Sequence, residues 1–233
     1  MMHGLILAGG EGSRLAASGV TAPKAIVPVG GRPQIGRLVT TARRLGCDTI
    51  TCAVRDDLAA TVHDTLADLS VRIFAVRTPT SLHTLEAALR TVPNGRVFCT
   101  LVDTVMPEAD WDVAHAQALA LLDQGADAVV AVTPFVADES PLWVDVSGDG
   151  VVRAFGRQGI VPLVTGGVYW LSHRARGVAT EAVSAGVNRL RGYLARLVDS
   201  GCRVETVVVP RIVDLDTDAD LRLAAALVEG ELS

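Results

Sequence analysis

Short apolar runs alternate with longer segments of helical periodicity, and this alternation constrains the fold more than any other feature of the chain. The first run, His3–Ala8, is apolar at nearly every position and ends at two glycines, which predicts a strand buried on both faces. Gln34–Leu45 then has apolar residues at helical intervals, and Gly46 follows as a helix stop. The chain therefore opens with a strand, a loop and a helix.

Further strand–helix units follow in the same order. The predicted strands are Asp48–Val54, Val71–Val76, Arg96–Val102 and Ala126–Thr133, and the predicted helices are Asp57–Leu69, Ser81–Thr91 and Trp111–Gln124. Such alternation indicates parallel strands with helices on both faces, and right-handed crossovers then give a doubly wound sheet. We therefore expect an α/β fold of three layers, Rossmann-like, with a mostly parallel sheet.

The pattern changes after Pro134. Leu142–Ser147 and Val151–Phe155 flank a Gly-Asp-Gly turn, which predicts a β-hairpin. The remaining predicted elements are a strand over Val164–Leu171, one helix over Glu181–Ser200 that is interrupted by Gly186 and Gly192, a strand over Val204–Val209 and a helix over Asp218–Glu229. No repeat or linker interrupts the chain, so we expect one domain over residues 1–233, with residues 134–170 as an insertion at one end of the sheet.

Composition and charge exclude several classes of protein. The chain is 49% hydrophobic and 20% charged, which excludes a disordered protein, and its net charge of −5 argues against a nucleic-acid binder. No apolar run is long enough to span a membrane, and the apolar start is too short for a signal peptide. The four cysteines form no CxxC pair and are expected to be free thiols. We therefore expect a cytoplasmic protein, whose oligomeric state is left open, a homo-oligomer included.

A glycine-rich loop follows the first strand, with the sequence Leu7-Ala8-Gly9-Gly10-Glu11-Gly12-Ser13-Arg14. Exposed backbone N–H groups and the start of the next helix together favour the binding of an anion. The loop lacks the Gly-Lys-Ser/Thr of a Walker motif, and the dinucleotide fingerprint is incomplete because Leu15 stands in place of its third glycine. By itself, the loop is also compatible with a simple tight turn.

Lys24 is the only lysine among 21 basic residues, and it lies in the segment PKAIVPVGGRP, which begins at Pro23. This segment and the preceding LAGGEGSRL together resemble the opening of the sugar-phosphate nucleotidyltransferases, the family that makes nucleotide sugars. A lysine is a compact charge that fits between two phosphates, whereas arginine is a broad planar fork. The resemblance implies the nucleotide-diphospho-sugar transferase fold and two catalytic residues, Arg14 on the phosphates and Lys24 near the reacting centre.

The resemblance also implies which residues contact an NTP. The glycine loop would wrap the triphosphate. Many family members read the base with a Gln and a Gly-Thr-Ala segment, where this chain has Thr78–Ala87, so the choice of nucleobase stays open. The expected nucleotide-binding residues are Leu7, Ala8, Gly9, Gly10, Glu11, Gly12, Ser13, Arg14, Ser81, His83 and Thr84.

Two acidic positions are expected to hold a metal ion. Asp103 ends the fourth strand, and ligands of α/β sheets bind at the carboxyl ends of strands. The family holds Mg²⁺ with an Asp at that place and with the first Asp of a late acidic segment, which corresponds to Asp214. Mg²⁺ takes one or two protein carboxylates together with phosphate oxygens, which fits this pair, and Mn²⁺ is the alternative. Asp216 stands where many members have Gly, whereas Asp218 and Asp220 are expected to serve a helix start.

The acceptor side is expected around the segment Thr165-Gly166-Gly167-Val168-Tyr169, which resembles the family's N-[AG]-G-x-Y strand. Its glycines allow the backbone to approach a substrate closely, and a role in packing alone is the alternative. Members specific for sugar 1-phosphates often have Glu-Lys after the hairpin, where this chain has Gly156-Arg157. The expected acceptor-binding residues are Arg157, Gly166, Gly167 and Tyr169, and the insertion over 134–170 is expected on the acceptor side.

The implied reaction is NTP + R–phosphate → NDP–R + pyrophosphate. A sugar 1-phosphate is the first acceptor class, and another phosphorylated alcohol such as phosphocholine is the second. An acceptor phosphate is largely ionised at neutral pH, so the reaction needs no general base, in agreement with the absence of a Ser/His/Asp or Cys/His arrangement. Catalysis would consist of positioning and charge stabilisation, and the expected partners are these small molecules rather than nucleic acid or membrane.

Other classes make different demands on the sequence. A non-catalytic nucleotide-binding regulatory domain does not need all of Arg14, Lys24, Asp103 and Asp214. An NAD(P) oxidoreductase would have the third glycine and a ribose-binding acid. Molybdopterin-modifying enzymes share a similar glycine loop but differ in the motif at Pro23.

Overall fold

The computed structural model describes residues 1–137 and 140–230. The strands of its main sheet are β1 (Met2–Ala8), β4 (Thr49–Arg55), β5 (Arg72–Val76), β6 (Arg96–Leu101), β8 (Ala128–Thr133), β9 (Trp143–Val146), β10 (Val152–Phe155), β11 (Leu163–Leu171) and β12 (Val204–Val208). The helices are α1 (Ser13–Ala17), α2 (Gln34–Arg44), α3 (Ala59–Thr65), α4 (Ser81–Thr91), α5 (Glu108–Asp123), α6 (His173–Ser184), α7 (Leu190–Asp199) and α8 (Asp218–Glu229). The short elements are β2 (Pro28–Val29) with β3 (Arg32–Pro33), β7 (Thr104–Val105) with β13 (Val213–Asp214), and the 3₁₀ turn η1 (Asp56–Leu58).

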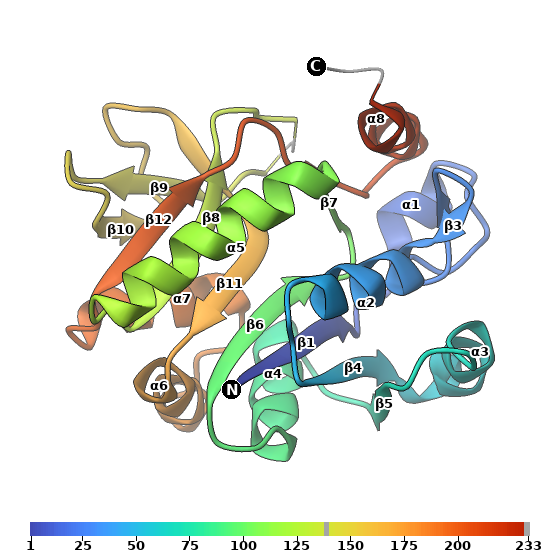
Figure 1. Cartoon of the computed structure of the whole chain (residues 1–233), viewed down its shortest axis with the longest axis horizontal. Coiled ribbons are helices and arrows are strands. Elements are labelled where there is room, and N and C mark those ends of the chain that lie inside the picture. The colour runs from blue at the N-terminus through green and yellow to red at the C-terminus, as the bar shows by residue number, and fades with distance from the viewer. Residues whose placement is uncertain (138–139, 231–233) are drawn as a thin grey trace.

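The main sheet is mixed but mostly parallel, and helices cover both of its faces (Figure 1). Its strands are ordered β10-β9-β11-β6-β1-β4-β5, and β8 and β12 continue from β11 on a second branch. The pairs within β5-β4-β1-β6 are parallel, as is β8 with β12, whereas β11 is antiparallel to β6, β8 and β9. The predicted α/β, Rossmann-like fold is thus confirmed. None of the described helices is long and apolar enough to cross a membrane.

Strand β1 lies in the middle of the parallel part of the sheet. All seven of its residues are buried, which explains why its sequence is apolar at every position except His3 rather than alternating. Leu7 of β1 is in register with Leu101 of β6. The glycine loop after β1 and Asp103 after β6 therefore leave the sheet as neighbours at its carboxyl edge, where ligands of parallel sheets bind.

Residues 134–170 contribute both to an edge of the sheet and to its interior. Strands β9 and β10 form the predicted hairpin at the edge, and Gly150 in its turn has a φ of +87°. Strand β11 instead runs between β6 and β8, with Val168 opposite Thr100. Tyr169 consequently lies in the middle of the sheet, on the strand next to β6, and Asp103 follows the end of β6.

The prediction of one helix over Glu181–Ser200, interrupted by Gly186 and Gly192, is wrong in its continuity, because the structure divides this region into two helices, α6 and α7, with the break at Gly186. Helix α6 starts earlier, where the Ser172 side chain accepts a hydrogen bond from Ala175 N at 3.3 Å as an N-cap. It ends before Gly186, whose φ of +79° is a left-handed conformation that stops a helix. The break places residues 185–189 as a loop in front of α7.

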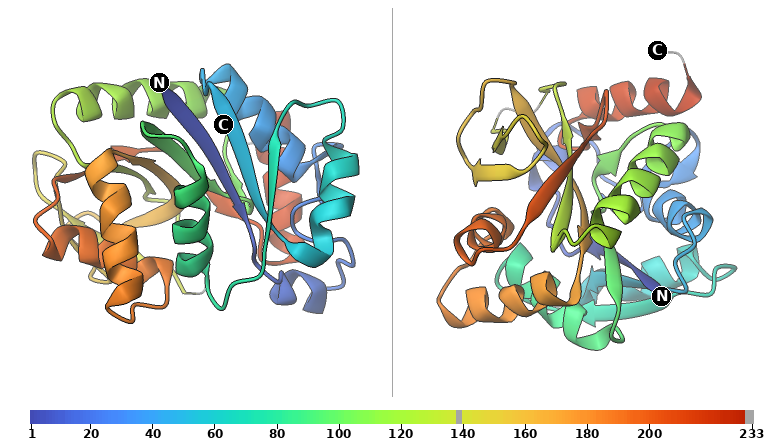
Figure 2. Two further views of the ribbon diagram at one scale, coloured as in Figure 1. Left: turned by 90° about the horizontal axis from the view of Figure 1, so that it is seen from below. Right: turned by 60° about the vertical axis from the view of Figure 1, so that its left-hand side comes forward.

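Two apolar clusters, one on each face of the sheet, hold the layers together. Helices α2, α3 and α5 pack on one face around Phe98 and Trp170, and α4, α6 and α7 pack on the other around Leu5 and Tyr193. Figure 2 shows the sheet edge-on between these two sets of helices. Trp170 is fully buried and donates a hydrogen bond to His115 Nδ1 at 3.0 Å, so its one polar group is satisfied.

A third, smaller cluster joins the two ends of the chain. It brings together Leu15 of α1, Val27 in the segment after Lys24, Leu215 after β13, and Leu227 of α8. In Figure 1, α8 lies beside α1 and β3, although these elements are far apart in the sequence. This packing holds the acidic C-terminal segment next to the glycine loop.

The close packing of β11 gives a stability test. A Cβ atom at Gly166 would lie 2.3 Å from Cδ1 and 2.6 Å from Cγ2 of the buried Ile212. We predict that Gly166→Ala lowers the free energy of unfolding by about 1–3 kcal/mol, because the isoleucine has to shift in a filled site. Urea denaturation measures this difference.

Gly177→Ala on α6 is the matched control, since nothing lies within 4 Å of a Cβ at that position. This variant should be as stable as the wild type or more stable by up to about 1 kcal/mol, because alanine is the better helix former. A Gly166→Ala variant as stable as Gly177→Ala would contradict the packing described.

Candidate active site

The site is built where β1 and β6 end. Asp103 follows β6, and the short ribbon of β7 with β13 lies next to it, with Asp214 opposite Thr104. Leu215 N donates a hydrogen bond to the Asp103 carbonyl oxygen at 3.0 Å. The two acidic positions predicted as metal ligands, Asp103 and Asp214, are therefore brought together although they are far apart in the sequence.

Lys24 is held between two carboxylates. Its Nζ donates to Asp103 Oδ2 at 3.1 Å and to Asp216 Oδ1 at 2.8 Å, and its side chain is only 10% exposed. Burial by itself would lower the pKa of Lys24, but the negative charges of Asp103 and Asp216 outweigh burial and raise the pKa above its ordinary value. Lys24 is consequently a permanent positive charge at neutral pH.

The segment around Lys24 is fixed by the start of α2. Ile35 N donates to the Ala25 carbonyl at 2.9 Å, and Gln34 N donates to that of Val27 at 3.0 Å. Buried Gln34 also donates from Nε2 to the Thr104 carbonyl at 2.8 Å, which joins this segment to β7. Lys24 therefore projects from a backbone that is tied to a helix and to the neighbouring ribbon.

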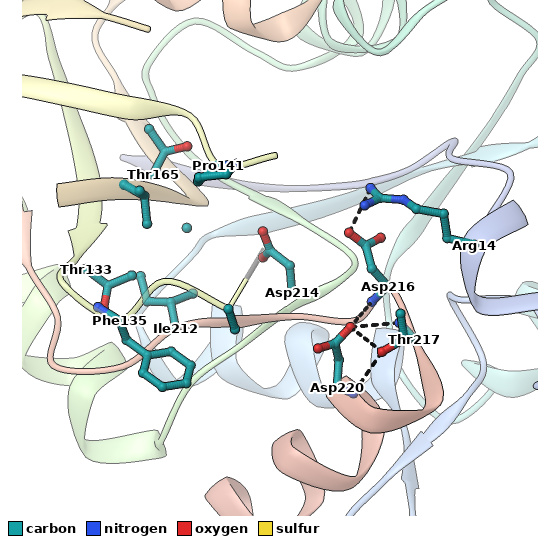
Figure 3. Close-up of a pocket in the computed structure, with 13 residues that line it drawn as sticks. Arg14, Thr133, Phe135, Pro141, Thr165, Ile212, Asp214, Asp216, Thr217 and Asp220 are labelled. Atoms are coloured by element: carbon teal, nitrogen blue, oxygen red, sulfur yellow. Dashed lines mark hydrogen bonds and ion pairs between the residues drawn. The ribbon is translucent and has the colours of Figure 1, made fainter. Parts of the chain in front are cut away.

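Arg14 and Asp216 extend the charged cluster. Arg14 Nη2 lies 2.7 Å from Asp216 Oδ2, and its side chain is 57% exposed. Asp220 Oδ2 accepts from Asp216 N at 3.2 Å and from Thr217 N at 2.8 Å, as part of the capping box that starts α8. Figure 3 shows Asp216 directed toward Arg14, while Asp220 turns back to Thr217. Asp220 thus serves the helix start, as predicted, whereas Asp218 pairs with Arg222 on the same helix.

A cavity of about 450 Å³ opens beside Lys24 and Asp103, and we name it the nucleotide-side cavity after the residues expected to bind a nucleotide. Of the predicted nucleotide-binding residues, those that line it are Leu7, Gly9, Gly10, Glu11, Ser81 and Thr84. Those that do not line it are Ala8, Gly12, Ser13, Arg14 and His83. His83 Nδ1 instead hydrogen-bonds Thr80 Oγ1 at 2.8 Å, and Gly12, with a φ of +64°, makes the turn into α1. Arg14 is exposed on α1 and reaches the site through Asp216.

The glycine loop and α4 approach closely along this cavity. A Cβ at Gly9 would lie 3.2 Å from Thr84 Oγ1, so a larger residue would push against α4. Thr84 Oγ1 lies 2.6 Å from Thr78 Oγ1 and donates to the Thr80 carbonyl at 3.2 Å. These threonines therefore brace the wall of the cavity that follows β5.

An acceptor-side cavity of about 550 Å³ lies against β11. Gly167 and Tyr169, two of the residues expected to bind the acceptor, line it together with Asp214, and this cavity is named for that expectation. It shares Thr80 and Ser81 with the nucleotide-side cavity. The Tyr169 phenol is fully enclosed, and burial raises its pKa, so it stays protonated and able to donate a hydrogen bond. The two cavities therefore meet beside the carboxylates.

Two predicted acceptor residues lie elsewhere. Gly166 lines a third, smaller cavity of about 140 Å³ on the other side of Asp214, together with Arg14 and Asp216 (Figure 3). Arg157 forms an ion pair with Asp145 of β9 and lines none of these three cavities. The Cβ that Gly166 lacks would collide with Ile212, so packing accounts for this glycine.

Sequence reasoning missed the positive charge of the acceptor-side cavity. Arg189 and Arg191 line it from the start of α7, where Arg191 also hydrogen-bonds the Ser140 carbonyl oxygen. These two arginines carry no predicted role. Gly186 interrupts the predicted helix, which continues across it, whereas the structure ends α6 before Gly186 and starts α7 at Leu190.

The carboxylates fit a Mg²⁺ ion that also binds phosphate. Asp103 Oδ1 is buried and has no hydrogen-bond partner within residues 1–137 and 140–230, while its Oδ2 is taken by Lys24. No group of three or more His, Cys, Asp or Glu side chains in the described chain could hold a metal ion by itself. Mg²⁺ typically uses one or two protein carboxylates and completes its coordination shell with water and substrate phosphates. Asp103 and Asp214 would supply the two carboxylates of such a shell.

The fold and this site define an α/β protein with a largely buried charged cluster at the carboxyl edge of its sheet. The chain belongs to the MobA-like NTP transferase domain family, whose model matches residues 4–203. A search of curated proteins finds no significant match.

Solved structures share the fold over nearly the whole chain. An inositol-1-phosphate CTP transferase from T. maritima is similar with a TM-score of 0.81 and 17% identity over 99% of this chain and 97% of its own. A candidate glucose-1-phosphate thymidylyltransferase from Bacillus anthracis gives 0.82 and 19% identity over 97% and 95%. HddC from Yersinia pseudotuberculosis gives 0.74 and 18% identity over 97% and 98%. At these identities the likeness shows a common fold.

The raised pKa of Lys24 gives a pH-dependent stability prediction. Its ion pairs are fully present below pH 10.5, the ordinary pKa, and are lost as the pH rises through the higher folded value. In EDTA at neutral pH we predict that Lys24→Met lowers the free energy of unfolding by about 1–3 kcal/mol, because two partly solvated carboxylates lose their shared cation. The difference in the free energy of unfolding between wild type and variant should shrink above pH 10.5, as Lys24 loses its proton, and urea denaturation measures it. A difference that grows above that pH would contradict the ion pairs.

Proposed function

We propose that the protein transfers NMP from an NTP to a phosphorylated acceptor and releases pyrophosphate, with a sugar 1-phosphate as the first acceptor class. The main support is the position of Lys24 and its carboxylates. Lys24 and Asp103 line the nucleotide-side cavity, Asp214 lines the acceptor-side cavity, and the two cavities meet at Thr80 and Ser81. An NTP and an acceptor can therefore be bound together with their phosphates at one set of charges.

In the proposed reaction, an oxygen of the acceptor phosphate attacks the α-phosphorus of the NTP. The bond from the α-phosphorus to the bridging oxygen of the β-phosphate breaks, and pyrophosphate leaves with that electron pair. Lys24 stays protonated and stabilises the negative charge that gathers on the α-phosphoryl oxygens. Arg14, which reaches the charged cluster through its ion pair with Asp216, is proposed to bind the leaving pyrophosphate. The acceptor phosphate is already ionised, so no side chain has to remove a proton.

Asp103 and Asp214 are the residues proposed to hold Mg²⁺, or Mn²⁺ in its place. A divalent ion bound there neutralises phosphate charge and orients the triphosphate for in-line attack. Lys24 occupies only Oδ2 of Asp103, so the buried Oδ1, which has no hydrogen-bond partner among the described residues, would be available to such a cation. Mg²⁺ dependence is thus part of the proposal.

The lining of the acceptor-side cavity supports an anionic acceptor. Arg189 and Arg191 are proposed to bind the acceptor phosphate in place of Arg157, which is engaged by Asp145. Tyr169 and Gly167 would contact the alcohol portion. Much of the remaining wall is apolar and consists of Leu142, Leu190 and Leu194. An apolar wall beside cationic side chains also suits phosphocholine, which stays the second candidate acceptor. We propose a cytoplasmic location, where such substrates are available.

A two-stage screen tests the proposal. The four NTPs are first compared with Mg²⁺ by thermal shift, since a ligand that binds only the folded state raises the unfolding temperature. The best NTP is then combined with sugar 1-phosphates, inositol phosphate and phosphocholine, and pyrophosphate release is measured. Release that depends on both substrates supports a transferase. NTP binding without release in any combination would favour a non-catalytic regulatory domain.

We predict that Lys24→Ala lowers turnover by at least about 100-fold, as expected for loss of one preorganised donor to the transition state. Lys24→Arg should lower turnover to a similar degree, because a planar guanidinium does not fit between Asp103 and Asp216 as an ammonium does. Steady-state kinetics on variants shown to be folded by circular dichroism measures this. Near-normal turnover of Lys24→Ala would refute the role of Lys24.

The two acceptor-side arginines give a separate prediction. The double variant Arg189→Ala, Arg191→Ala should raise the KM for the acceptor at least about tenfold and leave the KM for the NTP nearly unchanged, because it removes charge from one cavity only. Arg157→Ala is the comparison, and its effect should be smaller, since Arg157 is paired with Asp145 outside the cavity. A larger effect of Arg157→Ala on this KM would instead indicate that the acceptor phosphate binds beside Arg157, near the hairpin.

A further inference from the structure

Asp216 bridges two cations that come from different parts of the chain. Its Oδ1 accepts from Lys24 Nζ at 2.8 Å, and its Oδ2 lies 2.7 Å from Arg14 Nη2. The Asp216 side chain is 15% exposed, so this bridge is largely shielded from water, whereas Arg14 is mostly exposed. Figure 3 shows the carboxylate reaching away from α8 toward Arg14. One acidic side chain thereby sets the distance between two positive charges.

The backbone that carries Asp216 is anchored on both sides. Leu215 is fully buried in the third apolar cluster, and its N–H is bonded to the Asp103 carbonyl. Asp216 N donates to Asp220 Oδ2 within the capping box of α8. A carboxylate held in this way can fix a flexible arginine more effectively than a surface ion pair, which has to order both side chains.

On the basis of the proposed function, we propose that Asp216 is a positioning residue, which holds Lys24 and Arg14 in the arrangement that the reacting triphosphate requires. An ammonium has three N–H donors. Asp103 and Asp216 take two of them, so the third is directed by these two bonds and is available to a phosphate oxygen. Arg14 is on a five-residue helix and is mostly exposed, and its ion pair with Asp216 directs it toward Lys24.

Two other roles for the same carboxylate make different predictions. A carboxylate that competes with the triphosphate for Lys24 and Arg14 would weaken NTP binding without helping the reaction, so its removal would lower KM and leave kcat equal or higher. A carboxylate that binds the metal ion would raise the Mg²⁺ concentration needed for half-maximal rate when removed. A positioning residue affects kcat, because misplaced charges stabilise the transition state less.

The kinetic test compares Asp216→Asn with Asp218→Asn. The first variant keeps the size of the side chain and removes the charge. The second removes a charge of the same segment, that of Asp218, which pairs with Arg222 on α8. We expect Asp216→Asn to lower kcat at least about tenfold without raising the KM for NTP or the Mg²⁺ requirement, and Asp218→Asn to leave all three unchanged. An unchanged or increased kcat, or a raised Mg²⁺ requirement, would overturn the inference.

The single lysine of the chain allows a test that does not depend on activity. After labelling with [15N]lysine, the protein has one side-chain ammonium resonance, that of Lys24. In Asp216→Asn this resonance should shift and broaden, because the ammonium loses a partner and exchanges faster with water, whereas in Asp218→Asn it should match the wild type. An unchanged resonance in Asp216→Asn would overturn the inference. If the wild type released no pyrophosphate at all, the proposed function would fail, and the resonance would still decide whether Asp216 fixes Lys24.

Discussion

The placement of Lys24 between Asp103 and Asp216 is the interaction on which the site depends. It joins three segments that are distant in the sequence, namely the loop before α2, the end of β6 and the segment before α8. An ammonium removed from water without a partner would be costly, and so would two adjacent carboxylates without a cation. Each charge here is compensated by the others, which allows a dense charged cluster to exist at the edge of an apolar sheet.

The rest of the fold brings these charges to one place. Parallel strands β1 and β6 end side by side, so the glycine loop and Asp103 leave the sheet as neighbours. The antiparallel strand β11 then approaches closely, since Gly167 has a φ of +71° and a Cβ there would lie only 2.6 Å from Thr104 Oγ1. The result is two cavities, one against the glycine loop and one against β11, with the charged cluster at their junction.

The sequence predicted the parts of this structure that depend on local pattern. A strand buried on both faces has to be continuously apolar, so β1 and its parallel neighbours could be located from periodicity. The glycine loop, Lys24 and the two carboxylates could be located because their residue types follow from phosphate chemistry and from a specific motif. These predictions needed only the order of residues along the chain.

The parts that sequence could not supply depend on contacts between distant segments. Arg189 and Arg191, at the start of α7, line the acceptor-side cavity, and no local pattern in the sequence showed that they would face it. Arg157 was expected beside the acceptor, yet Asp145 on the partner strand of the hairpin engages it. Asp216 differed from the related motif, and only the structure showed that it joins Arg14 to Lys24.

Oxygen-18 labelling tests the central claim most directly. The acceptor phosphate is enriched in ¹⁸O, the reaction is run with an unlabelled NTP and Mg²⁺, and the products are examined by ³¹P NMR and mass spectrometry. If the acceptor oxygen attacks the α-phosphorus, the nucleotide product retains all of the label, one ¹⁸O bridges its two phosphorus atoms, and the pyrophosphate contains none. Label in the pyrophosphate, or NTP cleavage with no labelled nucleotide product, would contradict the proposed transfer.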